Sequence, residues 1–311
     1  MSTYRALKGY NVKKVDSDPT NPQIGQVWYN DTANQIKVRT QVVAAWASGG
    51  NLNTGRSALQ GGGTQTAAIA AGGSAGPKTF SEEYDGSSWT EGNNLGTGRD
   101  TLGGVGTQTA ALVFGGYIDQ ANGNTVNVEE YNGTSWSEQN NLPAITAQVS
   151  GCGTQTAGLK CQGSPDAGTE EYNGTAWTAG GDLNTARYNG GTAGTQTAAV
   201  TCGGGDNASN HSEEYNGSSW TEGNNLNQSR KNFSGAGSQT AAIMFGGAPV
   251  SVEQYNGTSY TVASDLAVGR TFPTDAGTGS LALAAGGPDS AAASTELFSE
   301  AAANTQSLEV S

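Results

Sequence analysis

Charged residues that recur at fixed positions are the first candidates for chemistry in this 311-residue sequence. Glutamate precedes an aromatic residue by two positions in six copies, at Glu82, Glu129, Glu170, Glu213, Glu253 and Glu296. Arginine fills a second recurring position in five copies, at Arg56, Arg99, Arg187, Arg230 and Arg270, and Thr146 fills it in the remaining one. Such a ring of sites could bind an anionic or sugar ligand. Because buried carboxylates need partners, we expect structural Arg–Glu pairs instead, within each copy or between neighbours.

Histidine and cysteine are too few to build a catalytic or metal centre. The chain has one histidine, His211, so a Ser–His–Asp set or a histidine-ligated metal lacks partners. Cys152, Cys161 and Cys202 fall at positions that hold mostly apolar residues in the other copies, which predicts buried free thiols. We therefore expect no metal, no cofactor and no enzymatic activity. An isolated Asp/Glu pair is the basis of an alternative hypothesis, an uncharacterised enzyme.

Composition and charge exclude several classes of partner. The formal net charge of −13 argues against nucleic acid, because phosphate binding needs a Lys/Arg surface. No run of about 18 apolar residues occurs, so we expect no membrane span. Residues 1–20 lack the apolar stretch of a signal peptide, so we expect no ordinary secretory route. With 48 glycines and only 13% charged residues, the chain suits tightly stacked sheets with many turns.

A repeated phrase, Gly-Thr-Gln-Thr in its commonest form, sets the frame in which these residues lie. Its copies begin at Gly63, Gly106, Gly153, Gly194, Gly237 and Gly277, which are 43, 47, 41, 43 and 40 residues apart. A period of this length is typical of repeat architectures. In the second copy, short runs punctuated by glycine predict four strands, near 100–105, near 109–114, leading into Tyr131 and around Trp136. The phrase lies at the first turn, and Asn132-Gly133 is typical of a hairpin turn at the third.

The pattern of these strands carries a resemblance. A glycine doublet after the second strand, an aromatic residue on the third and a tryptophan on the fourth are similar to kelch repeats over residues 42–299. The resemblance implies a β-propeller, in which four-stranded blades surround a channel. Gln162-Gly163 in place of one doublet and Phe298 in place of a tyrosine depart from the pattern. We predict an all-β, six-bladed, kelch-like β-propeller over residues 41–311.

Closure of such a ring needs one more strand. The sixth copy has no tryptophan after its third strand, and residues 42–48 resemble a fourth strand without the preceding three. We predict that this N-terminal strand completes the sixth blade beside the strand that ends at Phe298, which removes a free sheet edge. The alternative is that the tail, residues 306–311, supplies the strand.

One class of loop varies while the rest of each copy keeps its spacing. It lies between the second and third strands, and this is where function could be placed. The longest of these loops, residues 117–127, offers Tyr117, Ile118, Asp119 and Asn122 as candidate contact residues. His211 lies in an equivalent loop. We expect these loops and the connections between blades to share one face.

Residues 1–40 stand outside the repeat. We expect a separate segment with a small β-hairpin from residues 24–30 and 35–38. Its phrase DPTNPQIGQVWYNDTANQIKV resembles segments of bacteriophage tail and fibre proteins, especially those of marine hosts. The resemblance implies a docking role for this segment, with Lys13, Lys14, Trp28 and Tyr29 as candidate docking residues.

Together with the repeats, this second resemblance implies a structural virion protein, present in multiple copies in the tail or fibre region. Residues 1–40 would bind other virion proteins, and the propeller would act as a spacer or host-contact module. One alternative is a carbohydrate-binding adhesin or receptor-binding propeller that contacts host-surface glycan. The other is an uncharacterised propeller enzyme.

Overall fold

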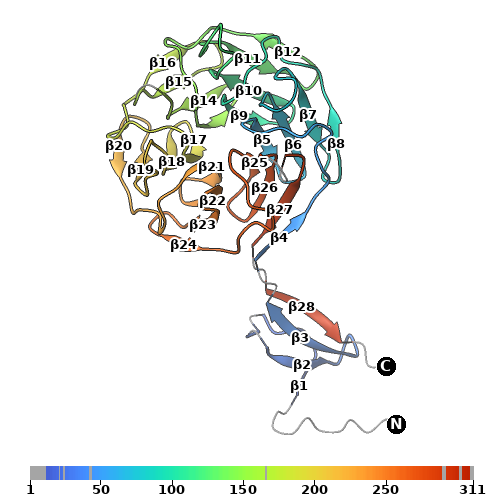
Figure 1. Ribbon diagram of the computed structural model, residues 1–311. Helices are drawn as coiled ribbons and strands as arrows, with labels where there is room; N and C mark the ends of the chain where they lie inside the picture. Colours follow the sequence, from blue (N-terminus) through green and yellow to red (C-terminus); the bar gives the residue numbers. More distant parts are fainter. Residues whose placement is uncertain are drawn as a thin grey trace. The chain divides into compact units, whose positions relative to one another are not determined.

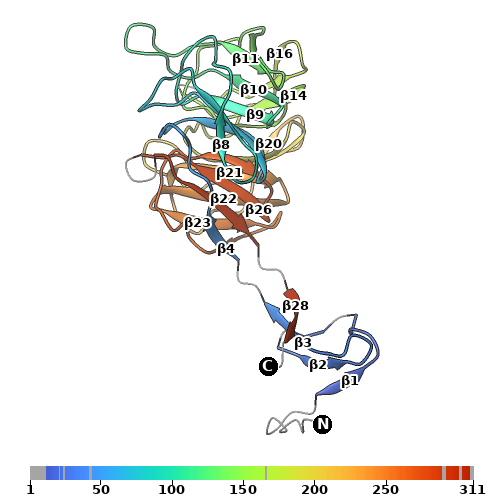
Figure 2. The ribbon, with the colours of Figure 1, turned by 90° about the vertical axis from the view of Figure 1, so that its right-hand side faces the viewer.

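The computed structural model describes residues 12–20, 22–23, 25–41, 44–164, 167–288, 292–300 and 303–308. Within these ranges the chain is all-β, as the sequence predicts; no helix is present that could cross a membrane. The chain divides into two units (Figure 1, Figure 2). One unit, called the ring below, takes Trp46–Ser299. The other, called the terminal sheet, takes the described residues up to Ala45 and those from Glu300 onward.

Of the seven four-stranded sheets among the described residues, six are built from ring strands. The first is β5 (Gln60–Thr64), β6 (Ala67–Ala71), β7 (Ser81–Tyr84) and β8 (Trp89–Glu91), and the second is β9 (Gly103–Thr107), β10 (Ala110–Phe114), β11 (Val128–Tyr131) and β12 (Trp136–Glu138). The third is β13 (Gly151–Thr154), β14 (Ala157–Lys160), β15 (Glu170–Tyr172) and β16 (Trp177–Ala179), and the fourth is β17 (Gly191–Thr195), β18 (Ala198–Cys202), β19 (Ser212–Tyr215) and β20 (Trp220–Glu222). The fifth is β21 (Lys231–Ser238), β22 (Ala241–Ala248), β23 (Ser251–Tyr255) and β24 (Tyr260–Val262), and the sixth is β25 (Thr274–Gly277), β26 (Leu281–Ala285), β27 (Thr295–Ser299) and β4 (Ala45–Ser48).

These sheets are arranged radially, with β8, β12, β16, β20 and β24 at the rim (Figure 1). Their first strands contact one another in a closed cycle: β5, β9, β13, β17, β21, β25 and β5 again. The cycle encloses a narrow channel lined mostly by glycine and other small residues. Neighbouring strands run antiparallel throughout the first five sheets and from β25 to β27 in the sixth, so the loops after second strands and the connections between sheets lie on one face.

The repeated phrase forms the turn between the first and second strands, as predicted. In the second sheet Thr107 pairs with Ala110, which leaves two residues in the turn. Gly106 has φ of 108°, and a Cβ there would lie 2.3 Å from the Ala110 carbonyl oxygen, so only glycine fits. The first strand was expected from residue 100. It begins at Gly103 instead, because Thr101 takes a left-handed conformation that interrupts the strand.

The glutamine of the phrase ties each sheet to the one before it, a role that sequence reasoning missed. Gln108 donates its side-chain amide to the Tyr84 carbonyl at 2.7 Å and to the Ala68 carbonyl at 3.3 Å. Gln65, Gln155, Gln196 and Gln239 make the equivalent pairs of bonds. The sixth copy has Gly279 here, where a Cβ would lie 2.5 Å from the Ala241 carbonyl oxygen. The repeated phrase is therefore a device for joining sheets.

The ring closes through its N-terminal strand. The sixth sheet has the order β25-β26-β27-β4, so the prediction that an N-terminal strand lies beside the strand carrying Phe298 is confirmed. Residues 42–43 of the predicted strand lie outside the described residues. The alternative, closure by the tail, is wrong, because β28 (Ala303–Leu308) pairs with β3 of the terminal sheet.

The terminal sheet has the order β1-β2-β3-β28, with β1 (Lys13–Val15), β2 (Val27–Asn30) and β3 (Gln35–Gln41). The predicted hairpin is present as the antiparallel pair β2 and β3; Ile24, at its expected start, lies outside the described residues. The predicted domain boundary, with all of residues 41–311 in the propeller, is wrong at the C-terminal end. Residues 303–308 pair with residues 36–41, so backbone hydrogen bonding assigns this strand to the other unit.

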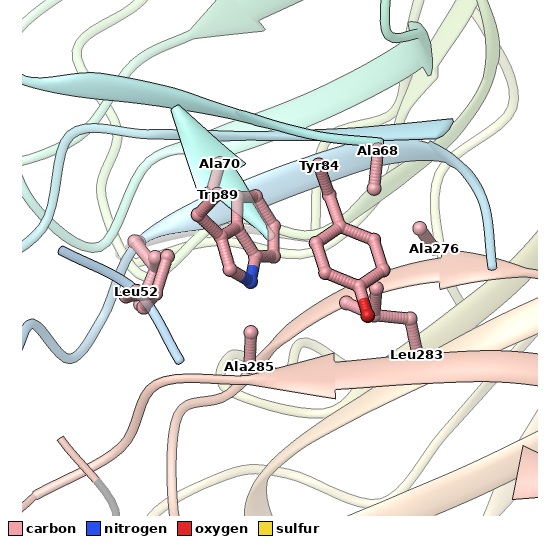
Figure 3. Close-up of a cluster of buried hydrophobic side chains, with 9 residues drawn as sticks. Leu52, Ala68, Ala70, Tyr84, Trp89, Ala276, Leu283 and Ala285 are labelled. Carbon is pink, nitrogen blue, oxygen red and sulfur yellow. The ribbon is translucent and has the colours of Figure 1, made fainter. Parts of the chain in front are cut away.

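Neighbouring sheets of the ring pack face to face through aromatic and small aliphatic side chains. Between the first and sixth sheets, Tyr84 and Trp89 lie with ring centroids 5.0 Å apart and pack near Leu283 and Ala285 (Figure 3). Cys152, Cys161 and Cys202 are free and buried in equivalent clusters, as predicted. Burial raises the pKa of the Cys161 and Cys202 thiols to about 11, which keeps them protonated and unreactive.

Candidate functional site

The repeated Arg and Glu residues form ion pairs within the ring. Nitrogen–oxygen distances are 2.8 Å for Arg56–Glu82, 3.2 Å for Arg99–Glu129, 2.7 Å for Arg187–Glu213, 3.5 Å for Arg230–Glu253 and 2.6 Å for Arg270–Glu296. In each pair the glutamate lies on the third strand of a sheet and the arginine in the connection that precedes the first strand of the same sheet, and both side chains are almost fully buried. Desolvation by burial lowers the pKa of Arg56, and the Glu82 charge opposes that shift.

Backbone amides occupy further acceptor positions on these glutamates, although Glu253 Oε1 has no hydrogen-bond partner among the described residues. Glu82 accepts the Asn53 N–H at 2.7 Å, and Glu129 accepts the Gly96 N–H at 2.7 Å. Glu213, Glu253 and Glu296 accept equivalent bonds at 2.7–2.8 Å. The donors belong to the connections that enter each sheet, so the pairs hold the connections in place. A carboxylate bonded in this way has little capacity left for a ligand.

The third sheet replaces the pair with different residues. Thr146 fills the arginine position, and Lys160 of β14 forms the ion pair with Glu170 at 2.9 Å. Lys160 is only 2% exposed and also donates to the Gly168 carbonyl at 2.8 Å. The equivalent positions on the other second strands hold Ala70, Val113, Thr201, Met244 and Ala284. This lysine, the one charged residue in that set, was the sequence signal for the exchange.

One carboxylate, Asp275, belongs to the residues that line the channel. Gln60 donates its side-chain amide to it at 3.3 Å. Burial raises the pKa of Asp275 to about 7, against 3.8 for a free aspartate. The equivalent first-strand positions hold Gly61, Gly104, Gly151, Thr192 and Gly235. Asp275 is therefore a departure from the repeat that the sequence analysis missed, although comparing the first strands of the six copies would have found it.

Six residues in the left-handed conformation surround the mouth of the channel. They are Ala58, Thr101, Gln148, Asn189, Asn232 and Phe272, with φ between 50° and 63°. Each N–H donates to the carbonyl of its counterpart in the preceding sheet, at 2.7–3.3 Å, and Ala58 donates to Phe272. The hydrogen bonds form a closed circle. A left-handed non-glycine residue costs about 1 kcal/mol, so this circle holds six strained residues and fixes their side chains at the mouth.

Beside the mouth lies a hollow of about 250 Å³ between the second and third sheets. It is lined by Asp100, Thr101, Tyr117, Asn124, Ala147 and Gln148. Lys78, from the loop of the first sheet, pairs with the Asp100 carboxylate at 2.6 Å and lies 4.9 Å from the Tyr117 ring centroid. The hollow thus combines an aromatic ring, a neutralised carboxylate and two amides.

Four of the predicted contact residues lie in the loop above this hollow. Tyr117 lines it, and the Ile118 carbonyl accepts a hydrogen bond from the Lys78 ammonium at 2.6 Å. Asp119 accepts the backbone N–H groups of Ala121 and Asn122 at 2.9 Å. The bonds from Asn122 lower the pKa of Asp119, which stays ionised and caps the turn. His211 lies apart, in the fourth sheet's loop, with Nδ1 3.7 Å from the Glu222 carboxylate.

The predicted docking residues lie on the terminal sheet in different environments. Trp28 is fully buried, and its indole N–H donates to Asp18 at 2.9 Å. The prediction that Trp28 contacts a partner is therefore wrong, because the ring packs inside its own unit. Lys13 and Lys14 are exposed, and Lys14 pairs with Asp31 at 2.9 Å. Tyr29 is partly exposed and donates its hydroxyl to Asn34.

Asp18 organises this unit. It accepts hydrogen bonds from Trp28 at 2.9 Å, Asn30 at 2.7 Å and Lys37 at 2.7 Å. The Lys37 bond, followed by those of Asn30 and Trp28, lowers the pKa of Asp18 to about 2. Asp18 therefore joins β2 to β3.

Comparison with known proteins identifies the fold. Neither the family models nor the curated proteins include a match to the chain. Among solved structures, that of YjhT is similar, with a TM-score of 0.67 and 13% sequence identity over 82% of this chain and 99% of that chain. This similarity and the four-stranded sheets show that the chain contains a β-propeller. At this identity the similarity concerns the fold alone.

Proposed function

We propose that this protein is a structural component of a bacteriophage virion, associated with the tail or fibre. In this proposal the terminal sheet docks onto other virion proteins, and the propeller is a spacer or host-contact module. The observation that carries the proposal is that the phage-like phrase forms the hairpin of a unit separate from the propeller. Strand β28, which follows the propeller in the sequence, belongs to the same unit as the hairpin.

We also infer that the propeller has six blades of the kelch type. Two features support this number: the closed cycle of first strands and the circle of hydrogen bonds at the channel mouth, which returns to Ala58 after Phe272. An arrangement with another blade would need a seventh residue in that circle.

The repeated charged groups of the propeller take part in its structure, which supports a role in contact rather than in catalysis. The repeated charges are committed to structural pairs. No group of three or more metal-ligating side chains gathers within the described part of the chain. The variable loops and the channel mouth share one face, so Tyr117 and the residues of the mouth are displayed together.

Incorporation into particles tests the docking proposal. Charge reversal of an exposed lysine and truncation of a partly exposed tyrosine, Lys13→Glu with Tyr29→Ala, should abolish incorporation while the protein keeps its thermal unfolding midpoint. A matched control, His211→Ala on the propeller, should be incorporated at the wild-type copy number. Undiminished incorporation of the double variant would show that the terminal sheet does not dock through this surface.

A carbohydrate-binding propeller is the second candidate function. It is favoured by one observation, the hollow beside Tyr117, whose lining combines an aromatic ring with amide and carboxylate groups. The two functions are compatible, because a host-contact module on a virion can bind glycan. For the third hypothesis, an uncharacterised propeller enzyme, Asp275 is the candidate residue, and the described residues that line the channel mouth with it include no second acid or base.

A further inference from the structure

The hollow beside Tyr117 is built from residues that interrupt the repeat. Tyr117 follows the glycine doublet of the second sheet, and the equivalent positions hold Ser74, Ser164, Gly205, Ala248 and Pro288. Asp100 follows the arginine of the same sheet and pairs with Tyr117 through an isolated β-bridge. An aromatic ring is thus placed in this position once among six copies. The repeat itself does not require it.

Two amides of the hollow are available to a ligand. Within the described residues, the side chains of Asn124 and Gln148 make no hydrogen bond to the protein, although each offers two donors and an acceptor. The Thr101 hydroxyl bonds only to Asp100, at 2.8 Å to its carbonyl and 3.3 Å to its carboxylate. Donors and acceptors of this kind suit adjacent hydroxyl groups.

The charges select the class of ligand. Lys78 neutralises Asp100 and is itself held by that carboxylate and by the Ile118 carbonyl, so neither charge is free to bind an ion. A single carboxylate beside an ammonium is a poor cation site. The net charge of −13 disfavours anions. A neutral polar molecule fits the hollow best.

The aromatic ring and the volume narrow the class further. A tyrosine ring has two apolar faces and a polar tip; Lys78 lies over one face of the Tyr117 ring, 4.9 Å from its centroid, and the opposite face suits the C–H face of a sugar ring. The hollow has a volume of about 250 Å³ and six lining residues, which suits one small ring rather than an oligosaccharide.

The hollow is also held in shape without a ligand. Ile118 donates its N–H to the Gly123 carbonyl at 2.9 Å, and Gly123 donates to the Asp119 carbonyl at 2.8 Å. Thr125 donates to the Gly116 carbonyl at 2.9 Å, which closes the base of the loop. A preformed site avoids much of the ordering cost of binding.

We propose that this hollow binds one neutral monosaccharide unit, stacked on Tyr117 and hydrogen-bonded by Asn124 and Gln148. The inference rests on the proposed function in one respect, that this face of the propeller is the contact face, and it names the chemistry of the partner. Host-surface glycan is the source it points to.

Titration of the full-length protein with D-glucose, D-galactose, D-mannose and N-acetyl-D-glucosamine, followed by saturation-transfer NMR, tests the proposal. At least one sugar should bind with a Kd of about 1 mM, typical of a small single-ring ligand. Tyr117→Ala and Asn124→Ala should each weaken binding by about tenfold or more. The control Tyr188→Ala removes the tyrosine of the fourth sheet's connection and should leave binding unchanged.

Several results would overturn the proposal: no binding of any of the four sugars, binding of N-acetylneuraminic acid alone, or equal loss in Tyr188→Ala. If Tyr117→Ala fails to fold, Asn124→Ala and Gln148→Ala decide the matter, because these side chains make no hydrogen bond within the described residues. Particle incorporation of Asn124→Ala, measured separately, distinguishes the two proposals. Asn124→Ala should lose sugar binding and still be incorporated into particles. The docking variant, Lys13→Glu with Tyr29→Ala, should still bind sugar.

Discussion

A pair of tyrosine-to-phenylalanine substitutions should have opposite effects on the stability of the propeller. Tyr215 donates its hydroxyl to the Glu171 carboxylate of the preceding sheet at 2.6 Å, and Tyr172 donates to Glu130 at 3.0 Å. Tyr131 and Tyr255 make the same kind of bond to Glu83 and Glu214. Tyr84 faces the sixth sheet, where the equivalent residue is Leu297, and its buried hydroxyl has no partner among the described residues.

The magnitudes follow from what each hydroxyl exchanges for water on folding. A hydrogen bond to a charged group contributes about 1.5–3 kcal/mol, so Tyr215→Phe should lower the free energy of unfolding by about 2 kcal/mol. An unpaired buried hydroxyl costs about 1–3 kcal/mol of desolvation, so Tyr84→Phe should raise the same free energy by about 1 kcal/mol. The native Phe298 at this position in the sixth sheet shows that phenylalanine fits.

Urea unfolding followed by tryptophan fluorescence measures both effects, provided that the slope of the transition is unchanged between variants. Tyr172→Phe is the control and should behave like Tyr215→Phe. Equal destabilisation by Tyr84→Phe and Tyr215→Phe would refute the reasoning, since it would mean that the hydroxyl of Tyr84 is as well bonded as the others.

Three other predictions concern the ring. Lys160→Met should lower the free energy of unfolding by about 3–5 kcal/mol, because it leaves the Glu170 carboxylate without its partner. Calorimetry measures this change, and a loss below about 1 kcal/mol would contradict a stabilising ion pair between the two residues. Burial raises the pKa of Asp275 to about 7, so the folded protein holds the proton of this carboxyl more tightly than the unfolded chain does. The free energy of unfolding should therefore fall by at most about 4 kcal/mol as the pH rises from about 4 to about 7, and Asp275→Asn should remove that fall. An unchanged pH profile of the unfolding midpoint would argue against a protonated carboxyl in the channel. Gly106→Ala should lower the free energy of unfolding by more than about 2 kcal/mol. Gly123→Ala is the control: Gly123 also has positive φ, but nothing lies within 4 Å of the added Cβ, so the loss should be about 1 kcal/mol. Equal losses in urea unfolding would show that backbone conformation alone decides both.

Much of the propeller could be predicted from the sequence because its spacing is regular. Fixed intervals located the turn after Gly106, the buried cysteines and the strand that closes the sixth sheet. Glycine at a turn and an aromatic residue on a strand are local features of the sequence, and they can be interpreted without knowing which distant residues pack against them.

What could not be predicted depends on contacts between distant residues. In the third sheet Thr146 replaces the arginine and Lys160, at a position that is not its neighbour in the repeat, forms the ion pair instead. The circle of left-handed residues forms only when the six sheets of the ring come together. The resemblance implied a docking role for Trp28, and its burial depends on partners that are distant in the sequence. Asp18 and the returning strand β28 were needed to complete that unit.

Mass spectrometry of purified particles tests the proposed function most directly. If the chain is a virion component, it should be found in particles in multiple copies per particle, at a constant ratio to the other tail proteins through successive purification steps. Its absence from purified particles, or a ratio that falls with each step, would contradict the proposal.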